Sequence, residues 1–102
     1  MPRSNAAAFP RRHQRLAAYY QALAHPARTM ILDRLLEREW DTFRSLTDAL
    51  PLSQASRSRH VGFLVRHRIL VPAVEHKVQG YRIHPDYYDA MRRASRELCR
   101  AA

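Results

Sequence analysis

Near Ile69 the spacing of apolar residues along the sequence changes, and this change limits the folds that the chain can adopt. Before this point, apolar residues recur every three or four residues over four segments, which predicts four helices. After it, residues 69–75 and 78–83 are rich in β-branched and aromatic residues around a polar tip, which predicts a hairpin. Residues 85–99 then return to helical spacing. The pattern predicts a single, mainly α domain of about five helices with a small two-stranded β-hairpin.

Proline and capping residues divide the helical part. Pro26 suits the first position of a second helix, after a first helix over residues 11–24. Asp41 or Thr42 can cap a short third helix, and Ser53 can cap a fourth that runs to about Arg68. The turn of residues 49–53 is short enough to hold the third and fourth helices at a steep angle. We therefore expect a winged helix-turn-helix, with the helix-turn-helix in residues 42–68 and the wing in residues 69–84.

Positive charge is concentrated in two blocks of the chain. The 18 Lys and Arg residues outnumber 9 Asp and Glu residues, which gives a net charge of +9, and only Lys77 is a lysine. Residues 1–15 carry +4 and residues 51–84 carry +5, whereas residues 16–50 carry −1. The guanidinium fork of arginine suits phosphates and base edges. An anionic polymer is therefore the first partner to expect.

Composition excludes several classes of protein. A single cysteine, Cys99, rules out an internal disulfide framework and a multi-cysteine zinc site. The two glycines, Gly62 and Gly80, stand apart, so no glycine-rich phosphate loop exists and we expect no cofactor. No apolar run approaches the length of a membrane span or a signal peptide, so we expect a cytoplasmic protein. No serine, histidine and aspartate pattern indicates catalysis, and we expect no enzyme activity.

The predicted fourth helix begins with a polar and basic run, residues 53–60, that contains no acid. In a winged helix-turn-helix this helix enters the DNA major groove. Steps of 100° per residue place Ser56, Arg59, Phe63 and Arg66 on one face, opposite Val61 and Leu64. The expected DNA contacts are Gln54, Ser56, Arg57, Arg59, His60 and Lys77, with His67 as a further phosphate contact.

Within this set, Ser56 and Arg59 are the candidates for base edges, and Lys77 at the hairpin tip for the DNA backbone. The arginines of the N-terminal basic block, residues 1–15, lie outside the predicted helix-turn-helix and wing. These arginines could form an arm on phosphate or in the minor groove. We expect instead a flexible, partly disordered arm over residues 1–10 that adds only non-specific affinity. The arginines of this block are Arg3, Arg11, Arg12 and Arg15.

Residues 22–28 with Ile31 and Leu32 resemble the ALAxPxRxxIL opening of ArsR/SmtB-type regulators. Residues 52–61 resemble the LSQxxxSRHL recognition helix of that family, and residues 81–83 its second wing strand. The resemblance spans residues 16–98 and implies a homodimeric transcription factor, usually a repressor that leaves DNA when an effector binds. It also implies that the first and last helices, residues 11–24 and 85–99, build the dimer.

The last helix has a matching stripe, in which Tyr87, Met91, Ala94 and Leu98 recur at four, three and four residues. Little of the chain remains to cover this stripe, so a second copy is its expected partner. The expected interface residues are Leu16, Tyr20, Tyr87, Met91, Ala94 and Leu98. Tyr19, Tyr20, Tyr87 and Tyr88 could instead line a ligand pocket, although dimer packing is the plainer account.

The sequence departs from the family at its metal-binding positions. Where metal-sensing members carry a cysteine pair, residues 39–43 contain no thiol. Where others place ligands on the last helix, this chain has Pro85, Tyr87, Leu98 and Ala101. His84, Asp86 and Glu97 are better read as surface or capping residues than as ligands. We therefore expect no metal site, and regulation through Cys99 is a minor alternative.

Two further departures affect the fourth helix. Arg57 replaces an apolar residue of the family pattern, and we expect it to extend towards the DNA backbone. Arg68 stands where a helix-ending glycine is usual.

These features together favour a homodimeric repressor that binds a pseudo-palindromic double-stranded DNA operator. The alternative is a basic RNA-binding or ribosome-associated protein, which would expose stacking aromatics in its basic region. Phe63 and Tyr81 are the only aromatic residues within residues 51–84, and both have packing roles. The lack of further stacking aromatics favours DNA over RNA as the partner. A third alternative is a module that uses the fold to bind a protein.

Overall fold

The computed structural model describes residues 6–100, which form five α-helices and one antiparallel hairpin, as the sequence predicts. A short 3-10 turn over Ala6–Ala8 precedes the first helix. The elements in chain order are α1 (Arg11–Gln21), α2 (Pro26–Arg38), α3 (Phe43–Thr47), α4 (Gln54–Arg66), β1 (Leu70–Glu75), β2 (Val78–Ile83) and α5 (Tyr87–Cys99). Part of the expected N-terminal arm, including Arg3, lies outside the described residues.

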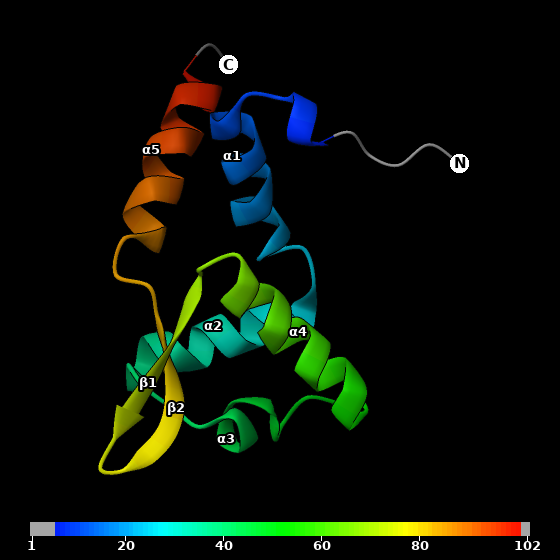
Figure 1. Cartoon of the computed structure of the whole chain (residues 1–102), viewed down its shortest axis with the longest axis vertical. Helices are drawn as coiled ribbons and strands as arrows, with labels where there is room; N and C mark the ends of the chain where they lie inside the picture. The colour runs from blue at the N-terminus through cyan, green and yellow to red at the C-terminus, as the bar shows by residue number, and fades with distance from the viewer. Residues whose placement is uncertain (1–5, 101–102) are drawn as a thin grey trace.

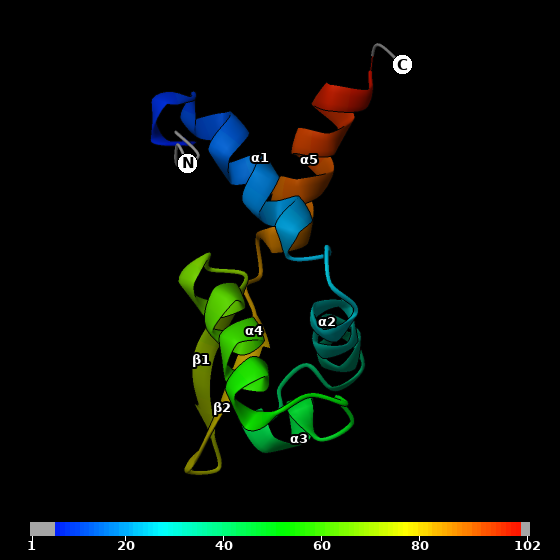
Figure 2. The same ribbon diagram turned by 90° about the vertical axis from the view of Figure 1, so that its right-hand side faces the viewer.

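The elements form two layers (Figures 1 and 2). Helices α1 and α5 pair at one end and diverge from each other like the arms of a V (Figure 2). Helices α2, α3 and α4 and the hairpin form the other layer, here called the lower body. The start of α4 and the hairpin tip lie at the end of the lower body that faces away from α1 and α5 (Figure 1).

Side chains fix the starts of the central helices. The His25 ring accepts the Ala27 amide at 3.0 Å before α2, where Pro26 occupies the first turn. The hydroxyls of Thr42 and Ser53 accept amides three residues later, each at 3.2 Å, and so cap α3 and α4. These contacts satisfy amides that have no partner inside the helix.

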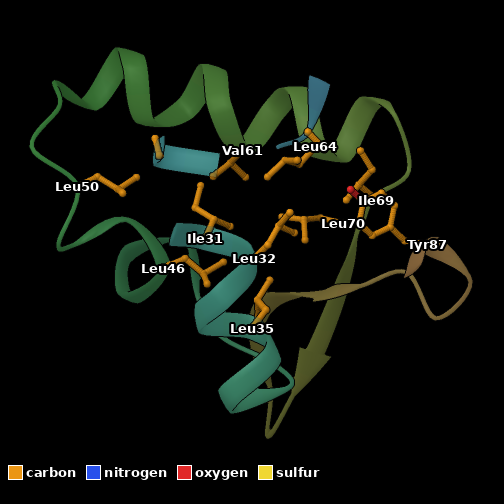
Figure 3. Close-up of a cluster of buried hydrophobic side chains, with 12 residues drawn as sticks. Ile31, Leu32, Leu35, Leu46, Leu50, Val61, Leu64, Ile69, Leu70 and Tyr87 are labelled. Carbon is orange, nitrogen blue, oxygen red and sulfur yellow. The ribbon is translucent and has the colours of Figure 1, made fainter. Parts of the chain in front are cut away.

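The core lies almost wholly in the lower body (Figure 3). Apolar side chains from α2, α3, α4 and the start of β1 point towards a common centre, and Leu50 of the turn closes it (Figure 3). The fully or nearly fully buried residues there are Ala27, Ile31, Leu32, Leu35, Leu46, Leu50, Val61, Leu64, Ile69 and Leu70. This packing fixes α4 relative to α2 and to the hairpin.

The hairpin is joined to the helical part of the lower body through β2 and the segment that follows α2. Leu70 pairs with Ile83 and Glu75 with Val78, so the turn contains only His76 and Lys77. Asp41 adds a one-residue bridge to Tyr81, with backbone hydrogen bonds of 2.9 and 3.2 Å. Trp40 lies so close to Gly80 that a Cβ there would come within 2.6 Å of the indole and of the Asp41 carbonyl. Glycine is therefore required at this position.

Helix α4 ends in a Schellman motif. The amide of Ile69 donates to the carbonyl of Leu64 at 2.9 Å, and that of Arg68 donates to Val65 at 3.0 Å. Arg68 has a φ of 59°, in the left-handed region that glycine adopts most easily. The chain thus makes the family's usual helix ending with an arginine in place of glycine.

Candidate nucleic-acid interface

Helices α3 and α4 are joined by a turn whose apolar residues are partly buried. Leu50 is buried, and its carbonyl accepts the Leu52 amide at 2.8 Å, which makes the turn tight. Ser53 then starts α4 in an extended conformation. Because Leu46 and Leu50 pack on one side and Val61 and Leu64 on the other, the α3–turn–α4 unit is held as a rigid corner.

The exposed face of α4 is polar and free of acid. Gln54, Ser58, Arg59 and Arg66 are exposed, and Ser56 is half-buried at the edge of this face. One Arg59 Nη atom donates to the Ser56 hydroxyl at 2.9 Å. This contact orders the guanidinium at the start of the helix and leaves its remaining N–H groups to donate elsewhere.

Phe63 does not lie on this face, contrary to the expectation from 100° steps. It is half-buried, with the guanidinium carbon of Arg28 at 4.5 Å from its ring centre and the His67 ring at 4.4 Å. The face is rotated towards Ser58 and Gly62 because α2 packs against the Phe63 side of α4. Gly62, which sequence reasoning did not assign, lies here, and a methyl group added to it would meet nothing within 4 Å.

Arg57 does not extend towards the outer surface, as the expected contact with the DNA backbone would require. Its Nε donates to the Leu52 carbonyl and one Nη to the Leu50 carbonyl, each at 3.0 Å. Turn carbonyls have no helical partner, and they attract a guanidinium that would otherwise be buried beside Val61. Arg57 therefore braces the turn against α4.

His60 is also turned inward. Its ring centre is 4.2 Å from that of His25, and its Nδ1 is 3.3 Å from an Arg28 Nη atom. Burial, together with the positive charges of Arg28 and Arg59, lowers the pKa of His60 below its usual value. The packed imidazole joins α2 to α4, an inward orientation that differs from the outward one expected for a phosphate contact.

The hairpin presents Lys77 at an exposed tip. His76 and Lys77 have φ values of 49° and 66°, which is the signature of a type I′ turn. Asparagine and glycine adopt this conformation more easily. An ion pair between Glu75 and Arg82 flanks the tip, so Lys77 is left as the outermost cation of the hairpin among the described residues.

A buried carboxylate fixes the base of the hairpin to α2. Asp41 is 6 % exposed, and its Oδ2 lies 2.9 Å from Arg34 Nε and 3.8 Å from an Arg38 Nη atom. Its Oδ1 accepts the Thr42 amide at 2.9 Å. Burial alone would raise the pKa of Asp41, but hydrogen bonds from Arg34, Ser45 and the Thr42 amide lower it overall. Of the two residues expected to cap α3, Thr42 is the cap, because its hydroxyl accepts the Ser45 amide.

Helices α1 and α5 enclose an open groove of about 810 Å³, lined by Leu16, Ala94 and Leu98 among others. Leu98 is 60 % exposed, Met91 is half-buried and Tyr20 is exposed. The Tyr20 hydroxyl forms a hydrogen bond with Ser95 across the two helices.

Tyr87 differs from the other residues of the stripe. It is only 3 % exposed, and its hydroxyl donates to the Tyr19 carbonyl at 3.1 Å. Burial first, and then the neighbouring tyrosines Tyr88 and Tyr19, raise the pKa of Tyr87 to about 12. Tyr87 therefore joins α5 to α1 within one chain, and it is not available to a second copy.

Other kinds of site find little support in the part of the chain that the structure describes. Among residues 6–100, no group of three or more His, Cys, Asp and Glu side chains could hold a metal ion. Cys99 is exposed at the end of α5. Within the same residues, every helix is too short or too polar to cross a membrane.

The fold resembles solved structures of transcriptional regulators. An ArsR family transcriptional regulator has a TM-score of 0.74 and 24 % identity, covering 87 % of this chain and 91 % of its own. An ArsR-like transcriptional regulator from Rhodococcus sp. RHA1 has a TM-score of 0.71 and 24 % identity, covering 87 % and 82 %. The transcriptional repressor BigR from Xylella fastidiosa has a TM-score of 0.61 and 21 % identity, covering 86 % and 89 %.

No protein-family model and no curated protein matches the chain. The solved structures therefore show its fold, which is the winged helix-turn-helix of ArsR-type regulators. The resemblance that the sequence motifs indicate is confirmed at that level. All three proteins are described as regulators or repressors, and none as an enzyme.

Proposed function

We propose that this chain is a sequence-specific, double-stranded-DNA-binding transcriptional regulator that acts as a homodimeric repressor in the cytoplasm. The observation that carries this proposal is the exposed, acid-free face of α4, held rigidly by a packed helix-turn-helix. An α-helix with such a face fits the DNA major groove, where arginine donates to guanine O6 and N7. The three regulators of the same fold add support, and BigR is described as a repressor.

In this proposal Arg59, Gln54 and Ser56 read base edges, and Lys77 contacts the backbone beside the groove. Arg57 and His60 act indirectly, since they hold the turn and α2 against α4. The groove between α1 and α5 receives the same helices of a second copy, with Leu16, Met91, Ala94 and Leu98 in the contact. Two-fold symmetry then places the half-sites about 34 Å apart, or a simple multiple of that distance.

We also propose that this regulator does not sense metal through the family's usual positions. Residues 39–43 supply no thiol, and α5 carries Tyr87 and Leu98 at two of the expected ligand positions. Tyr87 is committed to Tyr19, and Leu98 has no donor atom.

Selection from random DNA duplexes with the purified chain, repeated at two salt concentrations, tests this function. We expect an enriched inverted repeat with the spacing given above. Structured RNA should compete poorly for the selected duplex. Enrichment without any motif, or better competition by RNA, would contradict the proposal.

Two variants separate the roles within the interface. Arg59→Ala should reduce the discrimination between operator and random duplex by about 1–3 kcal/mol, because it removes a base-edge donor. Lys77→Ala should weaken binding to both duplexes alike and reduce the salt slope by about one unit. Arg92→Ala, which removes the same charge on the exposed side of α5, is the matched control. Equal losses on both duplexes for Arg59→Ala would make Arg59 a phosphate contact only.

A further inference from the structure

A second cavity lies between the two layers of the molecule, away from the DNA-facing end. Its volume is about 500 Å³, within the range of small-molecule sites. Its walls come from α1, from the C-terminal end of α4 and from the segment between β2 and α5. At 1.5 Å per residue, Arg66 lies about 18 Å along α4 from Gln54, so this cavity is distant from the base-reading end.

Six of the twelve residues that line the cavity are basic, a feature that it shares with the groove between α1 and α5, whose lining includes Arg12, Arg93 and Arg96. The basic residues in its walls are Arg11, Arg15, Arg66, His67, Arg68 and His84. Asp86 is the acid among its described lining residues, and its backbone amide donates to His84 Nδ1 at 3.1 Å.

The four arginines of the cavity lack acidic partners. Within residues 6–100, none of Arg11, Arg15, Arg66 and Arg68 forms an ion pair, which is also true of seven other arginines; the five that do are Arg34, Arg38, Arg82, Arg92 and Arg100. Like charges that line one concave surface repel each other and concentrate a positive potential there. A bound anion would neutralise this charge.

Arg68 is placed there at a cost in stability. Its φ of 59° is disfavoured by about 1–2 kcal/mol for residues that have a Cβ atom. Glycine would make the same Schellman ending without this cost. The backbone thus gains nothing from the arginine, and what it contributes here is its guanidinium at the cavity.

We propose that this cavity binds a small molecule bearing two or more phosphate or carboxylate groups. Guanidinium groups bind both kinds of oxyanion through paired N–H donors, with the positions of Arg66 and Arg68 fixed by the end of α4. The volume of about 500 Å³ matches the size of a small polyanion.

The position of the cavity gives its ligand a route to DNA binding, and this part rests on the proposed function. One wall belongs to α1, in the proposed dimer layer, and another to α4, the proposed recognition helix. A ligand that binds one arrangement of these helices better than another shifts the population towards it. Operator affinity and ligand affinity are then coupled reciprocally.

Calorimetric titration of the full chain tests the site directly. The probes are inorganic pyrophosphate and citrate, each added at constant ionic strength set with sodium chloride. We expect at least one probe to bind, and its affinity to fall at least tenfold in the double variant Arg66→Ala, Arg68→Gly. The difference in affinity between pyrophosphate and citrate identifies phosphate or carboxylate as the preferred group.

Two controls keep this titration interpretable. The double variant and Arg68→Gly alone should both melt at the same temperature as the natural chain or higher, since both relieve the left-handed arginine, so lost binding cannot come from unfolding. Arg92→Ala should bind the probe normally. Absence of binding by either probe at millimolar concentration, or equal affinity in all variants, would overturn the proposal. Loss of duplex affinity in Arg68→Gly without probe binding would assign the cavity to the DNA surface instead.

Duplex binding with and without saturating probe tests the coupling separately. We expect operator affinity to change in the natural chain and to stay constant in the double variant. Probe binding with unchanged operator affinity would retain the site and refute the coupling. Failure to bind any duplex would refute the proposed function while leaving the calorimetric result intact.

Discussion

The lower body and the α1–α5 layer bury their apolar residues to very different extents. Helix α2 has four buried residues and α4 has two, and they meet the turn and the hairpin in one core. Helix α1 has no buried residue, and α5 has only Tyr87. The lower body is therefore complete within one chain, whereas the α1–α5 layer leaves apolar surface that its own chain does not cover.

This difference matches the two tasks that the proposed function assigns to one small chain. A recognition helix must be held within a fraction of an ångström of its working position, which requires buried contacts on several sides. An interface between copies needs the opposite, an apolar stripe that stays open until a partner arrives. Substitutions in the lower body should therefore change the free energy of unfolding, whereas substitutions in the α1–α5 layer should change the association between copies.

Leu64→Ala should have the largest effect. Leu64 is fully buried where α4 meets α2 and β1, so its truncation should lower the free energy of unfolding by about 2–5 kcal/mol. Chemical denaturation monitored by circular dichroism measures this loss. Leu98→Ala, the same substitution at an exposed position of α5, is the control under monomeric conditions. Similar losses in both variants would remove the contrast between the layers.

Leu98→Glu should act on association instead of folding. If a second copy buries Leu98, a charge there removes about 1.5–3 kcal/mol of apolar burial per side chain, which weakens the dimer at least tenfold. Light scattering across a concentration series measures the change in mass, while circular dichroism should show the same helix content. An unchanged mass would place the contact elsewhere.

Asp41→Asn tests how firmly the hairpin is fixed to α2. The substitution removes a buried charge that Arg34 and Arg38 face, and we expect a loss of about 1–3 kcal/mol in unfolding free energy at pH 7. Because the folded pKa of Asp41 is lowered, its contribution is present above the ordinary value of 3.8. It is lost as the pH falls through the folded pKa.

The natural chain and the Asp41→Asn variant should consequently become more alike in acid. Urea titrations of both at pH 7 and pH 3 give the comparison. A difference that stays constant, or that grows on acidification, would contradict the role assigned to the carboxylate.

Gly62→Ala should have the smallest effect, and in the stabilising direction. A methyl group at this position meets nothing within 4 Å, and alanine favours a helix over glycine by about 0.5–1 kcal/mol. A small rise in melting temperature would agree with this. Reduced operator affinity in the same variant would show that DNA approaches α4 closely at Gly62, and destabilisation would show that the helix surface is less open than described.

The local elements could be predicted from the sequence because local residues determine them. Pro26, Thr42, Pro51 and Ser53 mark helix starts and turns through their own backbone and side-chain chemistry. The change to β-branched residues after Ile69 likewise predicts the hairpin. The α3–turn–α4 unit and its exposed Arg59 follow from these signals.

The orientations of His60, Phe63 and Tyr87 depend on segments far away in the chain, and spacing alone misplaces them. Spacing also misplaces Arg57, whose orientation depends on turn carbonyls five and seven residues before it. Arg57 turns towards turn carbonyls, His60 and Phe63 meet Arg28 of α2, and Tyr87 reaches Tyr19 across 68 residues. The requirement for glycine at Gly80 has the same origin, since the indole that excludes a side chain comes from residue 40.

Trp40 is the only tryptophan of the chain, and its indole N–H donates to the Ala73 carbonyl at 2.8 Å beneath the hairpin. Indole emission depends on such contacts and on exposure to water. The tryptophan emission of the unlabelled protein, as distinct from the emission of its five tyrosines, thus comes from one place, the seam between the wing and the rest of the lower body. Any event that lifts or tightens the wing, including the arrival of DNA, has a built-in optical reporter.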